Sequence, residues 1–274
     1  MGLHLFEEAF PGLNANIARC EKLGFPWASR PYVLEVAGEV VSHVGLLDYP
    51  VHAGGKKYAI GALHAICTKA SHRGHGYASE LIQKALTWAQ EHYECLLLFT
   101  DIPQFYERLS FRLIQEHRFC LPLSHPKGSK ALLPICSPQD DRLFIRTFRE
   151  RAVVSDHFWV QDNGQIASFN SLFATYPTYW SLYYCSAFDG LLSFEIKDNT
   201  LHLYDIVAKT IPSLDTILDH LPSPIEEIYF YFSPDLLCAS SVCDSTTTDF
   251  NGCLMVHGTF PVDYSFMIPP LSRC

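Results

Sequence analysis

The spacing of apolar positions predicts that helices and strands alternate along this chain. In residues 13–23 and 78–89 the apolar side chains recur every three or four positions, which is the period of an amphipathic helix. Other stretches have the short continuous or alternating apolar runs that favour strands. These expected strands are residues 31–37, 39–49, 58–68 and 94–100. The order predicts an α/β fold built on a mixed sheet.

The second half of the chain shows a similar order of elements. Apolar runs flank Asp162-Asn163-Gly164, a sequence that is typical of a hairpin turn between two strands. The elements expected here are strands at residues 158–161, 165–173, 201–208 and 227–232 and a short helix at residues 214–221. Element order alone is a weak sign of a repeat. The second half is therefore either a degenerate copy of the first or an unrelated α+β domain.

Prolines and a glycine interrupt the chain between residues 121 and 141, as they do in linkers. A length of 274 residues also exceeds the commonest size of a single domain. We therefore expect a first domain at residues 1–125, a linker at 126–141 and a second domain at 142–274.

A glycine-rich turn joins the strand ending at Thr68 to the helix that follows. Its sequence is His72-Arg73-Gly74-His75-Gly76-Tyr77-Ala78. Backbone N–H groups at such a turn point outward at the positive end of a helix and bind anions. The turn lacks the Gly-Lys-Ser/Thr ending of nucleoside triphosphate loops, and no second glycine triplet marks a dinucleotide fold. A diphosphate attached to another group is the ligand that these features favour, unless the glycines serve the turn alone.

Two segments resemble motifs of the GNAT N-acetyltransferase superfamily. Residues 73–78 resemble its Arg/Gln-x-x-Gly-x-Gly/Ala motif, and Phe105-Tyr106-Glu107-Arg108-Leu109-Ser110-Phe111 resembles its later Phe-Tyr-x-x-Leu-Gly-Phe segment. The likeness covers roughly residues 30–120, with both motifs in the expected order. Ala70 replaces the usual proline before the loop, and Ser110 replaces the usual glycine. Family members usually begin with a strand before their first helix, and only a dozen residues are available for it here.

The resemblance implies an enzyme that transfers an acetyl group from acetyl-CoA to a primary amine by direct attack in a ternary complex. The loop residues implied to hold the diphosphate of acetyl-CoA are Arg73, Gly74, His75, Gly76, Tyr77 and Ala78. The strand residues implied to pair with its pantetheine arm are Ile66, Cys67 and Thr68. Tyr106 would protonate the departing thiolate. A protein that binds acyl-CoA for regulation or interaction, without transfer, is the alternative.

The group that takes the proton from the amine is left open by the sequence. His64 lies on the strand that leads into the loop and is one candidate, although such a histidine is more often a hydrogen-bonded core residue. Glu35 and Asp48 on the neighbouring strands are others, as is an ordered water. Some relatives use the carboxylate that ends the chain, which here belongs to Cys274. We expect the acceptor to be a small-molecule or peptide amine, but its identity is left open, as is the oligomeric state.

The composition limits which binding partners and which cellular compartment we expect for this protein. The net charge of −9 argues against nucleic acid or an anionic membrane as the main partner. Ten cysteines are scattered without a Cys-x-x-Cys pair, and no apolar run reaches membrane-spanning length, so we expect free thiols in the cytoplasm. His64, Cys67, His72 and His75 are close in sequence, but their irregular spacing does not favour a metal site, and we expect none.

Overall fold

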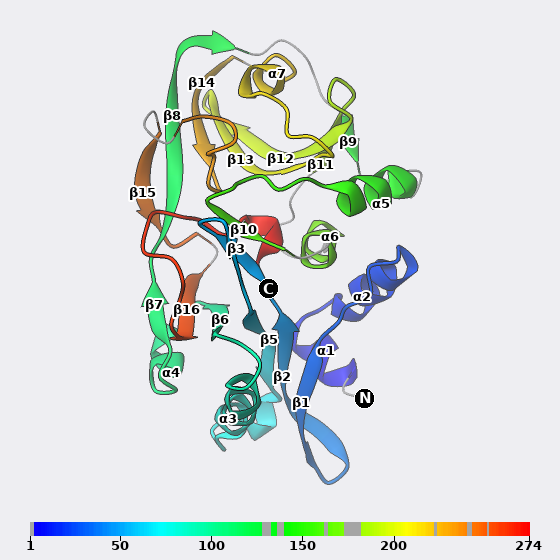
Figure 1. Cartoon of the computed structure of the whole chain (residues 1–274). Coiled ribbons are helices and arrows are strands. Elements are labelled where there is room, and N and C mark those ends of the chain that lie inside the picture. Colours follow the sequence, from blue (N-terminus) through cyan, green and yellow to red (C-terminus); the bar gives the residue numbers. More distant parts are fainter. Residues whose placement is uncertain are drawn as a thin grey trace.

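The computed structural model describes residues 3–127, 133–135, 140–161, 164–172, 182–221, 224–239, 243–250 and 252–274. Two large sheets lie at opposite ends of the molecule, with a small sheet between them (Figure 1). The large sheets have six and seven strands, and the small one has three. The mixed α/β fold expected from the sequence is confirmed.

The six-stranded sheet carries the elements predicted for the first half. Its order is β1 (Arg30–Val36), β2 (Glu39–Asp48), β5 (Ile60–Thr68), β6 (Cys95–Thr100), β16 (Cys253–Gly258) and β7 (Arg112–Ile114). Only β5 and β6 run parallel, and the other neighbours in this sheet are antiparallel. The hairpin predicted between the first two strands is confirmed, because Ala37 and Gly38 both have positive φ angles, of 52° and 82°.

Helix α3 (Tyr77–Ala89) covers one face of this sheet, as the apolar spacing predicts. Its buried positions are Leu81, Ile82, Ala85, Leu86 and Ala89. They share a core cluster with Leu63 of β5, Leu98 of β6 and Met255 of β16. Helix α2 (Leu13–Lys22) also forms where it is expected. Residues 3–9 form helix α1 (Leu3–Ala9), so the described residues before α2 contain a helix in place of the strand usual in the family.

The seven-stranded sheet holds most of the second half. Its order is β15 (Asp244–Thr248), β8 (Glu116–Lys127), β14 (Ile225–Phe230), β13 (Thr200–Val207), β12 (Gly190–Lys197), β11 (Leu182–Cys185) and β9 (Leu133–Ile135). Here β13 and β14 are the parallel pair. Helix α7 (Leu214–Leu218) packs on this sheet through Ile217 and Leu218. The strands predicted near 201–208 and 227–232 and the helix near 214–221 are thus confirmed, to within three residues at each end.

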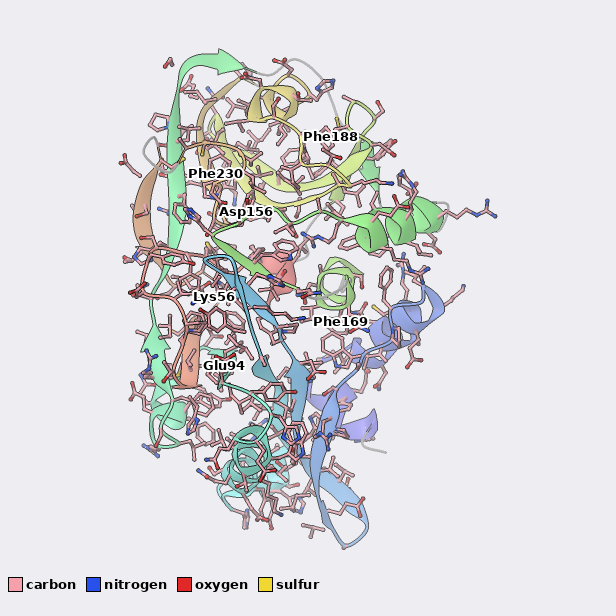
Figure 2. The ribbon with its side chains drawn as sticks, viewed as in Figure 1. Lys56, Glu94, Asp156, Phe169, Phe188 and Phe230 are labelled. Carbon is pink, nitrogen blue, oxygen red and sulfur yellow. The ribbon has the colours of Figure 1, made fainter. Side chains whose placement is uncertain are left out.

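A third, smaller sheet and a shared core join the two halves. The small sheet pairs β10 (Phe158–Val160) with β3 (Val51–Ala53), which pairs in turn with β4 (Lys56–Tyr58). The shared core contains Tyr49 and Ala62 from the first half together with Phe158, Ile166 and Phe266 from the second. Helices α5 (Asp141–Glu150) and α6 (Gln165–Leu172) lie beside this junction (Figure 1). Figure 2 shows Phe169 on the side of α6 that faces the first half.

One predicted element is wrong. Residues 165–172 form helix α6 and not the second strand of a hairpin, while residues 162, 163 and 173 lie outside the described part. Gly164 has a φ of 82°, and its carbonyl accepts the amide of Ser168 at 2.9 Å, which starts a helical turn. Contacts far away in the sequence hold the helix, since Asn16 Nδ2 donates to the carbonyl of Phe169 at 3.1 Å. Tertiary packing has overridden the local preference.

The two large sheets exchange strands across the expected domain boundary. Strand β16, near the end of the chain, lies between β6 and β7 of the first sheet, while β8 leaves the first half and pairs with β14 and β15. Of the expected linker, residues 126–127 belong to β8 and residues 133–135 form β9, whereas 128–132 and 136–139 lie outside the described residues. The division at 126–141 stays a prediction.

None of the helices in the described ranges combines the length and the apolar character of a membrane-spanning helix.

Candidate functional site

The glycine turn lies between β5 and α3, as predicted, and two glycines set its path. It begins as a short 3-10 turn, η1 (Ala70–His72), and continues through Gly74 and Gly76, whose φ angles are 81° and 79°. A Cβ atom at either glycine would meet no atom within 4 Å. Backbone conformation, and not crowding, is therefore the reason for glycine here. Gly76 is also the residue at which α3 begins.

The amides of this turn are free to bind a ligand. Among the described residues, none accepts a hydrogen bond from the backbone N–H of Gly74, His75 or Gly76, and all three residues are exposed. The first paired amide after them is that of Glu80, which donates to Gly76 at 3.0 Å. A row of exposed N–H groups at the start of a 13-residue helix has the geometry and the charge that favour an anion.

Two side chains of the turn bond to its own backbone. Arg73 Nε donates to the carbonyl of Thr68 at 3.1 Å, while its guanidinium is exposed. His75 Nδ1 lies 3.1 Å from the carbonyl oxygen of Arg73 and 3.2 Å from that of His72. The His75 ring stacks on Tyr77, with 5.5 Å between the ring centres. These contacts hold the turn in a conformation in which its backbone amides are exposed.

The strand that leads into the turn has a free edge. Strands β5 and β6 pair only from Ile60 with Cys95 to Ala62 with Leu97, and β6 then pairs with β16 alone. In the described part of the chain, the β6-facing edge of β5 beyond Ala62 therefore has no strand partner. Ile66, Cys67 and Thr68 lie along this divergent stretch, and each is partly exposed. An extended ligand could pair with this edge as an added strand would.

A bulge on the other side of β5 marks the same stretch. Ala65 has a φ of 47° and interrupts the pairing with β2 between His43 and Gly45. The carbonyl of Ala65 lies 2.8 Å from Nδ1 of His43, which holds the bulge in place. Bulges of this kind re-aim backbone groups next to binding sites. The sequence did not reveal Ala65, because no glycine or asparagine marks the position.

Tyr106 lies in helix α4 (Pro103–Glu107), which begins three positions after the last residue of β6. Its side chain is buried and packs edge-on against Phe105 and Phe111. Burial raises the pKa of the Tyr106 phenol to about 12, although a hydrogen bond with the side chain of Thr100 opposes this. The phenol therefore keeps its proton at neutral pH and can donate it. Thr100, the last residue of β6, is a neighbour that the sequence did not single out.

His64 is buried on β5, where it contacts Ser29 and Trp27. Its Nε2 atom lies 2.7 Å from the hydroxyl of Ser29, and its ring packs edge-on against Trp27. A Cβ atom on Gly45 of the neighbouring strand would collide with this ring, so glycine makes room for it. Burial lowers the pKa of His64 to about 3, with a smaller contribution from His43. The imidazole is therefore neutral at pH 7.

The other candidate bases lie apart from His64. Glu35 is exposed on the edge strand β1, opposite Val40. Asp48 is exposed at the opposite end of β2 from the glycine turn, where it accepts a hydrogen bond from Tyr93. Cys274 lies in the junction between the halves and packs against the shared core. The carbonyls of the two residues before it accept hydrogen bonds from Tyr49, at 2.6 Å, and from Asn170, at 2.6 Å.

Comparison with protein families identifies the first half. Residues 3–114 match the family model described as an acetyltransferase (GNAT) domain. This part of the chain is a GNAT acetyltransferase domain. The recognition made from its two short motifs is confirmed, and with it the assignment of the protein to the acyltransferases. No curated protein matches the chain.

Solved structures resemble the chain beyond its GNAT domain. A probable N-acyltransferase from Enterococcus faecalis is 13% identical with a TM-score of 0.53, and the alignment covers 93% of this chain and 70% of that one. Eis1 from Mycobacterium abscessus is 14% identical with a TM-score of 0.50, and the coverage is 91% and 71%. A GNAT protein from Anabaena variabilis is 15% identical with a TM-score of 0.50, and the coverage is 92% and 68%. At these identities the likeness concerns the fold, and it extends over both halves.

Ser110 shows how the GNAT domain keeps its later motif without the usual glycine. Ser110 has a φ of 63°, a conformation that glycine adopts more readily than serine. The turn around it is closed by the amide of Phe111, which donates to the carbonyl of Tyr106 at 3.1 Å. Serine at this position therefore makes the turn energetically more costly than glycine would.

The second half also has a pair of parallel strands that separate, and another part of its own chain bonds to β13 beyond that point. Strands β13 and β14 pair from Thr200 to Leu203 and then separate. Arg151 reaches into this region and bonds to Asp205 at 2.8 Å, and the amide of Ala152 donates to the carbonyl of Ala208 at 2.7 Å. The helix that follows, α7, has five residues and is capped by the Ser213 side chain, with no glycine turn before it. This half has no counterpart of the anion site in its described part.

Within the described residues, no group of three or more histidine, cysteine, aspartate or glutamate side chains lies close enough together to hold a metal ion.

Proposed function

We propose that this protein is an acetyl-CoA-dependent N-acetyltransferase that acts on a primary amine by direct attack within a ternary complex. The observation that carries the proposal is the continuity between the free edge of β5 and the exposed amides of the glycine turn. An elongated molecule with a diphosphate at one end and an amide-containing arm at the other fits both features at once. Acetyl-CoA has this form, and it is the acetyl donor of the GNAT family.

In this proposal the glycine turn and the free edge of β5 bind different parts of acetyl-CoA. The amides of Gly74, His75 and Gly76, with Arg73, Tyr77 and Ala78 around them, bind the diphosphate. The backbone of Ile66, Cys67 and Thr68 pairs with the pantetheine arm. The thioester then lies near the bulge at Ala65, between the separating ends of β5 and β6.

Tyr106 supplies the proton for the leaving group. Attack of the amine on the thioester carbonyl forms a C–N bond and then breaks the C–S bond, which releases the thiolate of CoA. The phenol of Tyr106 has a raised pKa, so it is protonated at the start of the reaction and can give its proton to sulfur. The phenolate is restored by a proton from water.

The amine must lose a proton before or during attack, and we propose that His64 accepts this proton. Its low pKa keeps it unprotonated at neutral pH but makes it a weak base. We therefore propose that His64 holds the proton only transiently and passes it to water. Measuring the pH dependence of kcat/KM in the His64→Gln variant tests this role, because a role confined to packing would leave the shape of the profile unchanged.

The second half contributes the far wall of the acceptor site in this proposal. The ring of Trp27 packs against His64, with 5.2 Å between ring centres, and against Phe169 of α6, at 4.4 Å. Aromatic rings from both halves therefore meet beside His64. We propose that the second half is a GNAT-like domain that has no coenzyme turn and shapes the acceptor site. A cytoplasmic location belongs to the same proposal.

Two measurements on the purified chain test the enzyme assignment. Calorimetry with acetyl-CoA should detect binding, and incubation with acetyl-CoA and a set of primary amines should release free CoA thiol. Binding without thiol release for any amine would favour the regulatory alternative. No binding at all would overturn the assignment of the glycine turn.

A further inference from the structure

Two cysteines of the second half are in direct contact. The Sγ atoms of Cys238 and Cys243 lie 2.8 Å apart, where one thiol can donate its hydrogen to the other. Both residues are partly exposed and neither is in a disulfide. Among the described cysteines, no other two have their sulfur atoms in hydrogen-bond contact. The contact lies in the second half, whereas the proposed acetyl-CoA site lies in the first.

Each sulfur is held by an ordered backbone. Cys238 ends a turn after β14, in which the amides of Leu237 and Cys238 both donate to the carbonyl of Pro234, at 2.8 and 3.0 Å. Cys243 directly precedes β15, whose first residue Asp244 pairs with Cys120 of β8. Both cysteines also pack against the apolar core of the seven-stranded sheet. The two thiols therefore face each other because two separate elements place them there.

Little movement separates this contact from a covalent bond. A disulfide has an S–S distance of about 2.05 Å, so the two sulfur atoms need to approach each other by only about 0.8 Å. We propose that Cys238 and Cys243 are a redox-active dithiol that is oxidised to an intramolecular disulfide by low-molecular-weight disulfides of the glutathione type.

The reaction has two exchange steps. The thiolate of one cysteine attacks a sulfur of the small disulfide, forms a mixed disulfide and releases one small thiol. The second cysteine then attacks the protein sulfur of that mixed disulfide, which forms the Cys238–Cys243 bond and releases the second small thiol. The two protons of the cysteines end on the two released thiols. The protein loses two electrons, and the small disulfide gains them.

Cys243 is suited to attack first. Burial raises the pKa of both thiols, and the carboxylates of Asp235 and Asp244 act in the same direction on Cys238 and Cys243 respectively. The hydrogen bond from Cys238, however, lowers the pKa of Cys243. The two thiols are thus suited to oxidation because they are close together, and not because their pKa is low. Since the thiolate is the attacking group, oxidation should become faster as the pH rises.

The bond would close a short loop between β14 and β15, two strands of the seven-stranded sheet, beside a segment that leads to the small sheet. The turn that ends at Cys238 contains Asp235, which accepts hydrogen bonds from the Ser155 hydroxyl at 2.5 Å and the Asp156 amide at 2.7 Å. The segment held in this way leads into β10 of the small sheet. On the other side, Cys243 precedes β15, which leads into β16 of the GNAT sheet.

The test uses the full chain and oxidised glutathione at about pH 8.5, near the ordinary pKa of a cysteine thiol. After oxidation, remaining thiols are alkylated in denaturant, and the protein is digested and analysed by mass spectrometry. We expect one peptide or peptide pair in which Cys238 and Cys243 are joined, lighter by two hydrogen atoms than the reduced form and restored by dithiothreitol. The Cys253→Ser variant, which removes a partly exposed cysteine elsewhere, should form the same product, and the Cys243→Ser variant should not.

The proposal is overturned if Cys238 and Cys243 are alkylated to the same extent as Cys253, or if each carries its own glutathione. Neither result would affect the assignment of the acetyl-CoA site, whose binding is measured separately by calorimetry.

Discussion

Arg273 and Glu116 form a buried ion pair, with 2.6 Å between Nη2 and Oε2. Glu116 is the first residue of β8, and its second oxygen accepts the amide of Ile268 at 2.9 Å. Arg273 donates to the carbonyl of Phe250 at 2.5 Å and lies over the ring of Phe99, at 4.6 Å from its centre. One carboxylate and one guanidinium therefore hold the last residues of the chain against both halves.

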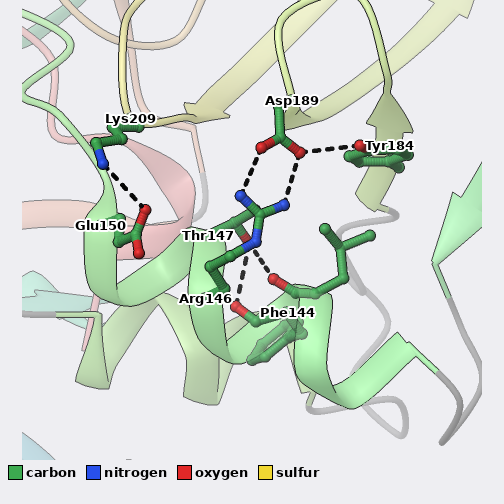
Figure 3. Close-up of polar contacts among 8 residues, drawn as sticks. Phe144, Arg146, Thr147, Glu150, Tyr184, Asp189 and Lys209 are labelled. Atoms are coloured by element: carbon green, nitrogen blue, oxygen red, sulfur yellow. Dashed lines mark hydrogen bonds and ion pairs between the residues drawn. The ribbon is translucent and has the colours of Figure 1, made fainter.

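Removing one partner of this ion pair should destabilise the fold strongly. In Glu116→Gln the guanidinium of Arg273 stays buried without a compensating charge, which typically costs about 3–5 kcal/mol. Urea denaturation should show a corresponding fall in the free energy of unfolding. Asp189→Asn is the matched control, because Asp189 pairs with Arg146 at 2.5 Å on the surface, with both side chains at least 40% exposed (Figure 3). That change should cost less than about 1 kcal/mol. Equal falls in the free energy of unfolding of the two variants would mean that the buried ion pair contributes no more to stability than the exposed one.

Substituting Gly76 should weaken acetyl-CoA binding more than it weakens the fold. Gly76→Ala forces alanine to a φ of 79°, which costs about 1 kcal/mol and reorients the amides at the start of α3. We expect at least about a tenfold rise in the Kd for acetyl-CoA, measured by calorimetry, because in the proposed site several of these amides hold the diphosphate. Gly38→Ala has the same strain, at a φ of 82° with no neighbour within 4 Å, but lies in the β1–β2 hairpin. The Kd of Gly38→Ala for acetyl-CoA should equal that of the unaltered protein. A similar loss of affinity in both variants would argue against the glycine turn as the acetyl-CoA site.

Removing the phenol hydroxyl of Tyr106 should slow turnover and spare binding. We expect kcat of Tyr106→Phe to fall about a hundredfold, since general acid catalysis commonly contributes that much or more. The Kd for acetyl-CoA should change less than about twofold, because the hydroxyl does not hold the diphosphate. Tyr204→Phe, a buried tyrosine of the second sheet, serves as the control and should keep its kcat. Unchanged turnover in Tyr106→Phe would remove Tyr106 from the mechanism.

His64 should make the stability of the protein depend on pH in a defined window. Its pKa is about 3 in the folded protein and 6.5 as the ordinary value, so between these values the unfolded chain binds the additional proton. The stability due to a neutral His64 is fully present above pH 6.5 and is lost as the pH falls towards 3, by about 1.4 kcal/mol per pH unit. Urea titrations at several pH values should show a shallower decline in His64→Gln. The same decline in both proteins would contradict the burial of a neutral imidazole.

The parts of the site that the sequence predicted are those fixed by nearby residues. The β1–β2 hairpin depends on Gly38, and the anion turn depends on Gly74 and Gly76, each within a few positions of what it shapes. The short helix with Tyr106 follows a buried strand closely in sequence. Such elements can be read from a single sequence, because their conformations are set by φ preferences and apolar spacing.

The parts that the sequence did not predict depend on distant partners. Residues 165–172 fit a strand or a helix by their apolar pattern, and the helix is held by bonds from Asn16 to Phe169 and from Asn170 to the last turn of the chain. The insertion of β16 beside β6 pairs residues more than 150 positions apart, as Met255 with Leu98. The burial of His64 against Gly45 and Ser29 is of the same kind. None of these contacts can be predicted from the residues that are nearby in the sequence.

The position of β16 also governs when the acetyltransferase half can be finished during synthesis. Until residues 253–258 have left the ribosome, β6 has no neighbour on one side and β7 has none at its inner edge. The nascent first half would expose an open sheet edge and the apolar surface that Leu254 and Val256 later cover. The coenzyme-binding half is thus made early, but its sheet can be completed only after residues 253–258 have been synthesised.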